Sequence, residues 1–109
     1  MTPNHHTKGI VMNIEKEIDN RIHKSGGGYP AWYVGTTTNP RKQLFEGHNV
    51  VERAGAWLYR DAGSESTAKT IEAIFLKRGC KGMGKRGGQD SSRYIYAYKM
   101  TRTTRGSQS

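Results

Sequence analysis

The sequence predicts a small α+β domain, with a mixed or antiparallel central sheet of about three strands flanked by three helices. The length of 109 residues is enough for one domain and no more. Helix-like and strand-like segments alternate, and a glycine or a capping residue stands at most of their boundaries. We therefore expect one folded unit at residues 10–100, between a flexible tail at residues 1–9 and a basic flexible tail at residues 101–109.

Two helices are predicted in the first half of the chain. The first has one apolar stripe, because isoleucine recurs every four residues, at Ile10, Ile14, Ile18 and Ile22. A run of three glycines, residues 26–28, ends this helix. The second is short and runs from Pro40 to about Glu46, with Asn39 as its N-cap and Gly47 at its end.

Three short segments rich in aromatic and β-branched residues predict strands, at residues 31–35, 56–61 and 93–100. A third helix from Ser64 to about Arg78 lies between the last two strands, and a loop of glycines and basic residues follows it. Within the first strand, the alternation of side chains places Tyr33 and Gly35 on the same face.

Composition excludes several classes of protein. No apolar run approaches the roughly 18 residues that a transmembrane helix needs. The polar N-terminal residues lack the apolar stretch of a secretory signal. A single cysteine, Cys80, cannot form an intramolecular disulfide. We expect a cytoplasmic protein, or an intracellular one in a host cell if a phage or mobile element encodes it.

Positive charge is the strongest signal in the composition. The chain has 18 Lys and Arg against 9 Asp and Glu, a net charge of +9. Residues 69–105 alone contain ten basic and two acidic residues. Such a stretch attracts polyphosphates through the release of counterions, so we expect a nucleic-acid partner. General solubility is the alternative, and an acidic membrane is disfavoured because the stretch is not an amphipathic helix.

The loop at residues 79–88 contains parts of two nucleotide-binding patterns. Both patterns require a strand before the loop and a helix after it. Here a helix precedes and a strand follows, so nucleotide binding of either kind is excluded. The backbone amides of the loop, together with Lys81, Lys85 and Arg86, could still hold a phosphate group.

Glu72 shares a face of the third predicted helix with Ala68, Phe75 and Leu76. A carboxylate on an apolar face is costly unless it meets a cation or hydrogen-bond donors. A hard divalent metal ion would satisfy it. The alternative is a glutamate at the edge of the core that is paired with Lys69.

Two further side chains are candidates for chemistry. His48 directly follows a helix end, where its ring could transfer a proton or contact a phosphate. Tyr33 stands next to Gly35 on a strand face, where a ligand could approach closely. The alternative for both residues is a packing role.

The segment from Trp32 to His48 resembles the second half of the GIY-YIG nuclease signature. Tyr33-Val34-Gly35 is similar to the YIG element, and Thr37 matches its threonine. The helix that carries Glu72 resembles the one that presents the metal-binding glutamate of that family. The resemblance covers residues 31–100 and implies a GIY-YIG-like fold.

The sequence departs from this family at three points. No Gly-Ile-Tyr strand precedes Tyr33 to form a hairpin with it, and Tyr29 is the available substitute for its tyrosine. Gln43 stands where the family has arginine, so Arg41 is the nearest guanidinium. His48 falls one residue later than the commonest spacing.

The resemblance implies metal-dependent hydrolysis of phosphodiester bonds in DNA. Glu72 would hold Mg²⁺ (or Mn²⁺), Tyr33 and His48 would orient or deprotonate the attacking water, and Arg41 would bind a phosphate oxygen. Further contacts with DNA or another nucleic acid are expected from the basic side chains of Lys42, Lys81, Lys85, Arg86 and Arg93. The alternative is an inactive module on the same scaffold that binds nucleic acid or inhibits an acidic protein partner. The sequence leaves the oligomeric state open.

Overall fold

The computed structural model describes residues 3–82, 92–101 and 104. Its helices and strands follow in the order α1 (Pro3–Ser25), β1 (Trp32–Thr37), α2 (Pro40–Lys42), β2 (Trp57–Asp61), α3 (Glu65–Arg78) and β3 (Tyr94–Lys99). Three short helical turns connect them, namely η1 (Tyr29–Ala31), η2 (Gln43–Gly47, a π-helical turn) and η3 (Glu52–Ala54). None of the described helices combines the length and the apolar character that crossing a lipid bilayer requires.

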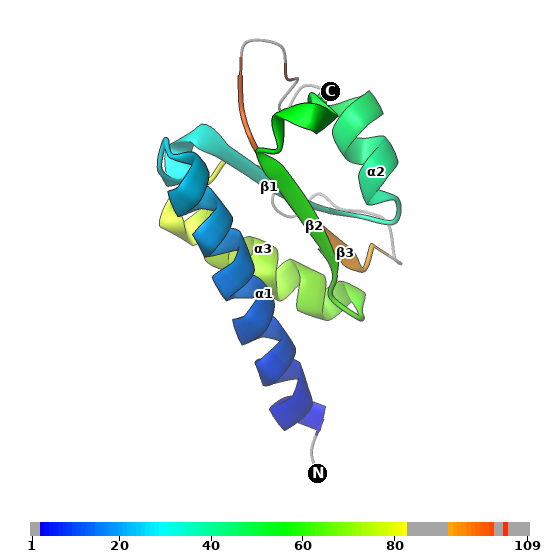
Figure 1. The fold of residues 1–109 in the computed structure, drawn as a ribbon. Coiled ribbons are helices and arrows are strands. Elements are labelled where there is room, and N and C mark those ends of the chain that lie inside the picture. The colour runs from blue at the N-terminus through cyan, green and yellow to red at the C-terminus, as the bar shows by residue number, and fades with distance from the viewer. Residues whose placement is uncertain (1–2, 83–91, 102–103, 105–109) are drawn as a thin grey trace.

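The three strands form one antiparallel sheet in the order β1-β3-β2 (Figure 1). The last strand of the chain is therefore the central one, between two strands that precede it in sequence. This sheet and its helices confirm the predicted α+β class. Of the two sheet arrangements that were predicted, mixed and antiparallel, the structure has the antiparallel one.

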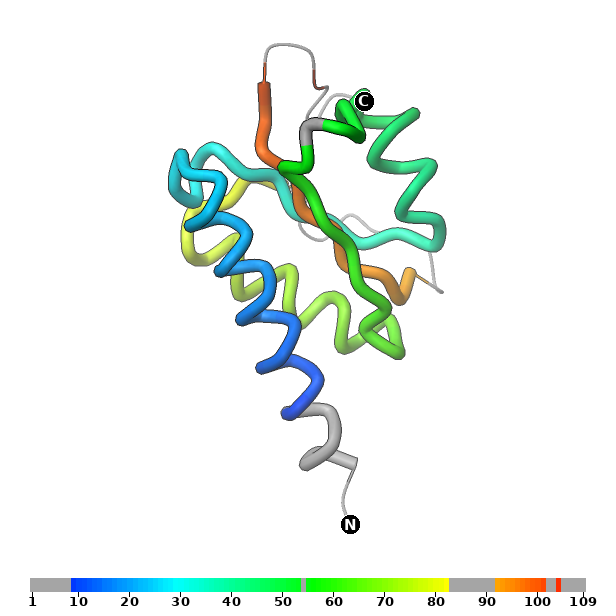
Figure 2. The backbone as a smooth tube through the Cα atoms, viewed as in Figure 1, coloured from blue at the N-terminus to red at the C-terminus, as the bar shows by residue number. Residues whose placement is uncertain are grey.

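The two faces of the sheet have different side chains. On the first, which we call the α1/α3 face, apolar strand residues pack against α1 and α3; they are Trp32, Val34, Leu58, Ile95 and Ala97. On the second, the tyrosine face, the strands present Tyr33, Tyr96, Tyr98, Trp57 and Tyr59. Helix α2 and the turn η2 lie on this second side (Figure 2). Alternation along each strand separates the two sets, since successive side chains point to opposite faces.

The ends of α2 and α3 have the caps that the sequence predicts. The side chain of Asn39 accepts a hydrogen bond from the backbone of Lys42, and that of Ser64 from Thr67. Gly79 ends α3 with φ at 119°, a backbone angle that favours glycine.

Helix α1 is longer than its isoleucine stripe indicates. It begins at Pro3, so residues 3–9 of the segment that we expected to be a tail are helical in the structure. Proline is tolerated in the first turn of a helix, and extending a formed helix by one residue costs little. The tail predicted at residues 101–109 lies mostly outside the described residues.

The outer edge of β1 is covered by the residues that follow α3. The Lys81 N–H donates to the Trp32 carbonyl at 2.8 Å, and the Val34 N–H donates to the Lys81 carbonyl at 2.9 Å. This contact needs a glycine at the next position, because a Cβ on Gly82 would lie 2.6 Å from the Val34 carbonyl oxygen. The pairing fixes the end of α3 beside β1, the strand that carries Tyr33.

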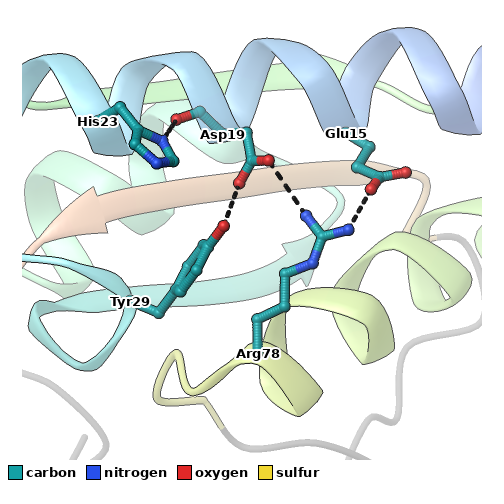
Figure 3. Close-up of polar contacts among 5 residues, drawn as sticks. All are labelled: Glu15, Asp19, His23, Tyr29 and Arg78. Atoms are coloured by element: carbon teal, nitrogen blue, oxygen red, sulfur yellow. Dashed lines mark hydrogen bonds and ion pairs between the residues drawn. The ribbon is translucent and has the colours of Figure 1, made fainter.

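A polar network ties α1 to α3 (Figure 3). The guanidinium of Arg78 forms ion pairs with Glu15 and Asp19 of α1. The hydroxyl of Tyr29 donates to Asp19 at 2.7 Å, and the ring of Tyr29 packs near Phe75. These contacts hold α3 in place and so help to position Glu72, which the helix carries.

Candidate functional site

Tyr33 lies at the centre of a cluster of rings on the tyrosine face. Its register partner on β3 is Tyr98, and their rings stack with centroids 5.3 Å apart. The ring of His48 lies 4.8 Å from that of Tyr33. Only 3% of Tyr33 and 3% of His48 is exposed, so the sheet and η2 enclose both residues.

A π-helical turn brings His48 to the sheet. The His48 N–H donates to the Gln43 carbonyl at 2.9 Å, a bond that spans one residue more than in an α-helix. This turn takes up one residue more than an α-helical turn would between Gln43 and His48. The ring therefore reaches Tyr33 in spite of the shifted spacing.

Both ring nitrogens of His48 meet tyrosine hydroxyls of β3. Nε2 lies 2.8 Å from Tyr96 Oη, and Nδ1 lies 2.9 Å from Tyr98 Oη. A neutral imidazole has one donor and one acceptor, so with His48 neutral these two bonds have opposite directions. The amide nitrogen of Gln43, which only donates, lies 3.4 Å from Nε2. This placement favours Nε2 as the acceptor of the Tyr96 proton, with Nδ1–H donating to Tyr98.

Gly35 makes room for the ring of Tyr96. The two residues are register partners, and a Cβ on Gly35 would lie 2.6 Å from Tyr96 Oη. We predicted that this glycine lets a ligand approach the strand. In the structure the ring of Tyr96 occupies that space, so the prediction is corrected: the glycine positions a tyrosine of the chain itself.

Glu72 is buried and forms no close ion pair with another described residue. It is 6% exposed, and Lys69 forms its ion pair with Glu65 at 3.3 Å instead. Burial raises the pKa of Glu72 to about 7, against the weaker opposing effect of the Lys69 charge. The alternative of an edge glutamate paired with Lys69 is therefore not what the structure shows.

The charge of Glu72 on α3 acts on Tyr33 of β1. Burial raises the pKa of Tyr33, and the negative charge of Glu72 raises it further. Burial likewise raises the pKa of Tyr96, with a smaller contribution from Glu72 among the nearby charges. The carboxylate of α3 is therefore within electrostatic range of the tyrosines of the sheet.

The oxygens of Tyr33 and Glu72 reach solvent. Neither side chain has a hydrogen bond to another described residue. Among the described residues, no fully buried side-chain oxygen or nitrogen lacks a partner, so these oxygens are accessible to water. The site thus combines enclosed rings with two polar groups that are open to a ligand.

A metal ion at this site would have one protein ligand. The described part of the chain contains no group of three His, Cys, Asp or Glu side chains that could hold a metal. The unpaired carboxylate of Glu72 still fits Mg²⁺, because this ion is often bound through one or two carboxylates while water and substrate phosphates complete its shell.

Arg41 does not join the cluster. Its guanidinium bonds Glu52 at 2.8 Å and lies 5.0 Å from the centre of the Phe45 ring. The position beside His48 belongs to Gln43, whose side-chain amide lies 3.4 Å from Nε2 and lowers the pKa of Tyr96 against the larger effect of burial. A role of Arg41 in catalysis stays a prediction that these contacts do not support.

The basic residues predicted to bind nucleic acid are spread over the molecule. Lys42 is exposed in α2, Lys81 is exposed beside β1, and Arg93 pairs with Asp61 at 2.9 Å next to β3. The other two, Lys85 and Arg86, lie outside the described residues.

Sequence reasoning missed two members of the cluster, namely Tyr96 and Tyr98. The alternation of tyrosines in the last strand indicated a common face but not that this strand adjoins Tyr33. Tyr29, the substitute named from the sequence, instead donates to Asp19 in the network between α1 and α3.

Comparisons of this chain with protein-family models, with curated proteins and with solved structures find no match.

Proposed function

We propose that this protein is a metal-dependent nuclease that hydrolyses phosphodiester bonds of DNA. One observation carries the proposal: Tyr33, whose ring lies 4.8 Å from that of His48, is within range of the Glu72 charge, and the oxygens of Tyr33 and Glu72 both reach solvent without a partner among the described residues. Placing a carboxylate where its pKa rises to about 7 disfavours its charged form, so a purely structural role gives no reason for it. Perturbed groups in such settings often mark functional sites.

Tyrosine and histidine side chains orient the attacking water and accept its proton in the proposed reaction. Tyr33 has a raised pKa, so its hydroxyl stays protonated near neutral pH and orients the attacking water by hydrogen bonding. The imidazole of His48 is the base. It takes the proton of the Tyr96 hydroxyl at Nε2, while Tyr96 takes one from the water, so that the proton count balances. Tyr98 holds Nδ1 and fixes the orientation of the ring.

Glu72 is the residue that would hold Mg²⁺ or Mn²⁺. When bound, the ion would polarise the phosphate and stabilise the leaving oxygen. Because a metal ligand must be deprotonated, binding competes with the proton that the raised pKa of Glu72 favours. We expect the metal to bind better in the presence of DNA, whose phosphate oxygens add ligands.

The sheet order supports a GIY-YIG-like site. In that family a hairpin strand beside the YIG strand supplies a tyrosine. Here β3 is the antiparallel neighbour of β1 and places Tyr96 opposite Gly35. We infer that the C-terminal strand supplies the tyrosine that a strand before Tyr33 would otherwise provide.

A second candidate is a module that binds nucleic acid without cutting it. The observation that favours it is Gln43, a neutral amide beside His48 where the resemblance has an arginine. An amide neutralises the charge of a phosphorane less well than a guanidinium does.

Cleavage of supercoiled plasmid tests the first candidate. We expect nicking with Mg²⁺ or Mn²⁺, none with a chelator, and a loss of about 100-fold or more in Glu72→Gln. Glu65→Gln, on the same helix but in an exposed ion pair, is the matched control and should cut like the wild type. Equal nicking by wild type and Glu72→Gln, or none by either, would contradict the proposal. A gain of nicking in Gln43→Arg would indicate the second candidate, with an otherwise intact site.

A further inference from the structure

Four aromatic rings form a continuous strip on the tyrosine face, outside the candidate active site. We call this the aromatic strip: Phe45, Trp57, Tyr59 and Tyr94. Phe45 meets Trp57 edge to face at 5.0 Å, Trp57 stacks with Tyr59 at 6.1 Å, and Tyr59 meets Tyr94 at 6.4 Å. All four residues are half-buried, whereas the tyrosines around His48 are enclosed.

Arginines flank the strip at both ends and along its side. The guanidinium of Arg41 lies 5.0 Å from the centre of the Phe45 ring, and that of Arg93 lies 5.7 Å from the centre of the Tyr94 ring. A shallow hollow of about 490 Å³ beside Trp57 and Tyr59 is also lined by Arg21 and Arg60. The strip is therefore a row of rings with a planar cation at each end.

The acidic partners of these arginines do not block a polyanion. Arg41 pairs with Glu52, and Arg93 pairs with Asp61, but the side chains of both pairs are 43–54% exposed. Ion pairs so exposed contribute little, and a phosphate group can replace their carboxylates. The net charge of +9 favours that exchange.

We propose that the aromatic strip binds unpaired nucleotides of a single-stranded nucleic acid, with bases stacked on the rings and phosphates at the flanking arginines. Partly exposed aromatic side chains on a basic sheet surface offer bases a stacking partner that needs no particular sequence. A duplex keeps its base faces stacked internally, so it cannot use the rings. The inference goes beyond cleavage, and it holds whether or not the chain cuts DNA.

Binding in the presence of a chelator tests the inference apart from cleavage. The probes are a labelled thymidine oligonucleotide about 15 nucleotides long and a labelled duplex of equal length. Fluorescence anisotropy measures the binding of each probe to the protein. We expect the single strand to bind more tightly at the same salt concentration and to quench tryptophan fluorescence. Trp57 is the tryptophan that can respond, because Trp32 is fully buried.

Matched variants separate stacking from charge. Tyr59→Leu should lower the affinity for the single strand about tenfold with an unchanged salt slope, and Tyr59→Phe should bind like the wild type. Arg93→Gln should reduce the salt slope by about one. Tyr29→Leu, at a half-buried tyrosine on the other side of the sheet, is the control and should bind normally.

Three results would overturn the inference. They are equal affinity for single strand and duplex, an unchanged affinity in Tyr59→Leu, and the absence of binding to either probe at low salt. Circular dichroism and thermal unfolding of each variant establish that a lost affinity does not come from a lost fold. Tyr59→Phe gives an independent readout, because this variant keeps the ring and should therefore keep the affinity that Tyr59→Leu loses.

Discussion

The two faces of the same sheet bury different kinds of side chain. On the α1/α3 face the strands and helices bury an apolar core, and charged groups such as those of Arg78 and Glu15 stay at the periphery. On the tyrosine face polar groups lie inside the cluster, where both nitrogens of His48 bond tyrosines. The first face buries apolar groups, and the second encloses polar groups that are hydrogen bonded to one another.

The alternation within β3 encodes this difference. Ile95 and Ala97 point to the α1/α3 face, whereas Tyr94, Tyr96 and Tyr98 point to the other. A shift of the register by one residue would exchange the two sets. One short strand can thus contribute to both the apolar core and the candidate site, provided that its register with β1 and β2 is fixed.

The largest effect is expected from truncating a ring on the α1/α3 face. Phe75 is fully buried, so Phe75→Ala should lower the free energy of unfolding by about 3–5 kcal/mol. Phe45→Ala, at a half-buried phenylalanine on the tyrosine face, should cost less than half of that. Urea denaturation measures both. If Phe75→Ala does not fold, Phe75→Leu and Phe45→Leu provide the same comparison, and equal losses would contradict it.

Removing the charge of Glu72 should stabilise the protein. Its pKa is raised to about 7 in the folded state, so the folded chain holds its proton more tightly than the unfolded chain. Wild-type stability therefore falls as the pH rises from about 4.5 to about 7, and then levels off. We expect Glu72→Gln to gain about 2–3 kcal/mol over the wild type near pH 8, with the gain vanishing near pH 4.

Unfolding in urea at several pH values measures this difference, with Glu65→Gln as the control without a pH-dependent gain. A Glu72→Gln variant that is less stable than the wild type at pH values above about 8 would show that the carboxylate has a structural partner. A variant that is more stable but fails to nick DNA would tie the unfavourable placement to function.

A smaller effect is expected from the hydrogen bonds of His48. Tyr96→Phe removes the hydroxyl that lies 2.8 Å from His48 Nε2. The nitrogen then keeps the longer contact of 3.4 Å with the Gln43 amide. We expect a loss of about 1–2 kcal/mol in the free energy of unfolding. Tyr59→Phe, which removes a hydroxyl from the half-exposed strip, is the control and should cost less. Equal losses would indicate that the bond to His48 adds nothing.

Local features of the sequence predict most of the elements. The caps Asn39, Ser64 and Gly79 form as their residue types indicate, and the three strands lie close to their predicted positions. The charge of Glu72 acts on Tyr33, but the predicted meeting of the two residues in one active site stays a prediction. Periodicity and capping act over a few residues, so the sequence displays them directly.

The rest depends on contacts between distant parts of the chain. Tyr96 and Tyr98 become neighbours of Tyr33 only because β3 inserts between β1 and β2, and no pattern within one strand specifies its partners. The π-helical turn that carries Gln43 and His48 has no sequence signature that we could read. The roles of these residues in cleavage stay predictions.

The smallest effect concerns the periphery of the α1/α3 face. Arg78 joins Glu15 and Asp19 of α1 and lies 5.1 Å from the centre of the Phe75 ring, so one side chain serves several contacts (Figure 3). Arg78→Met keeps the aliphatic stem and should lower the free energy of unfolding by about 1 kcal/mol, less so at about 1 M salt because ions screen the pairs. Arg60→Met breaks a single exposed pair with Glu17 and should cost at most about 0.5 kcal/mol. Urea denaturation at low and high salt compares the two variants, and equal costs would show that bridging two helices adds nothing to an ordinary surface pair.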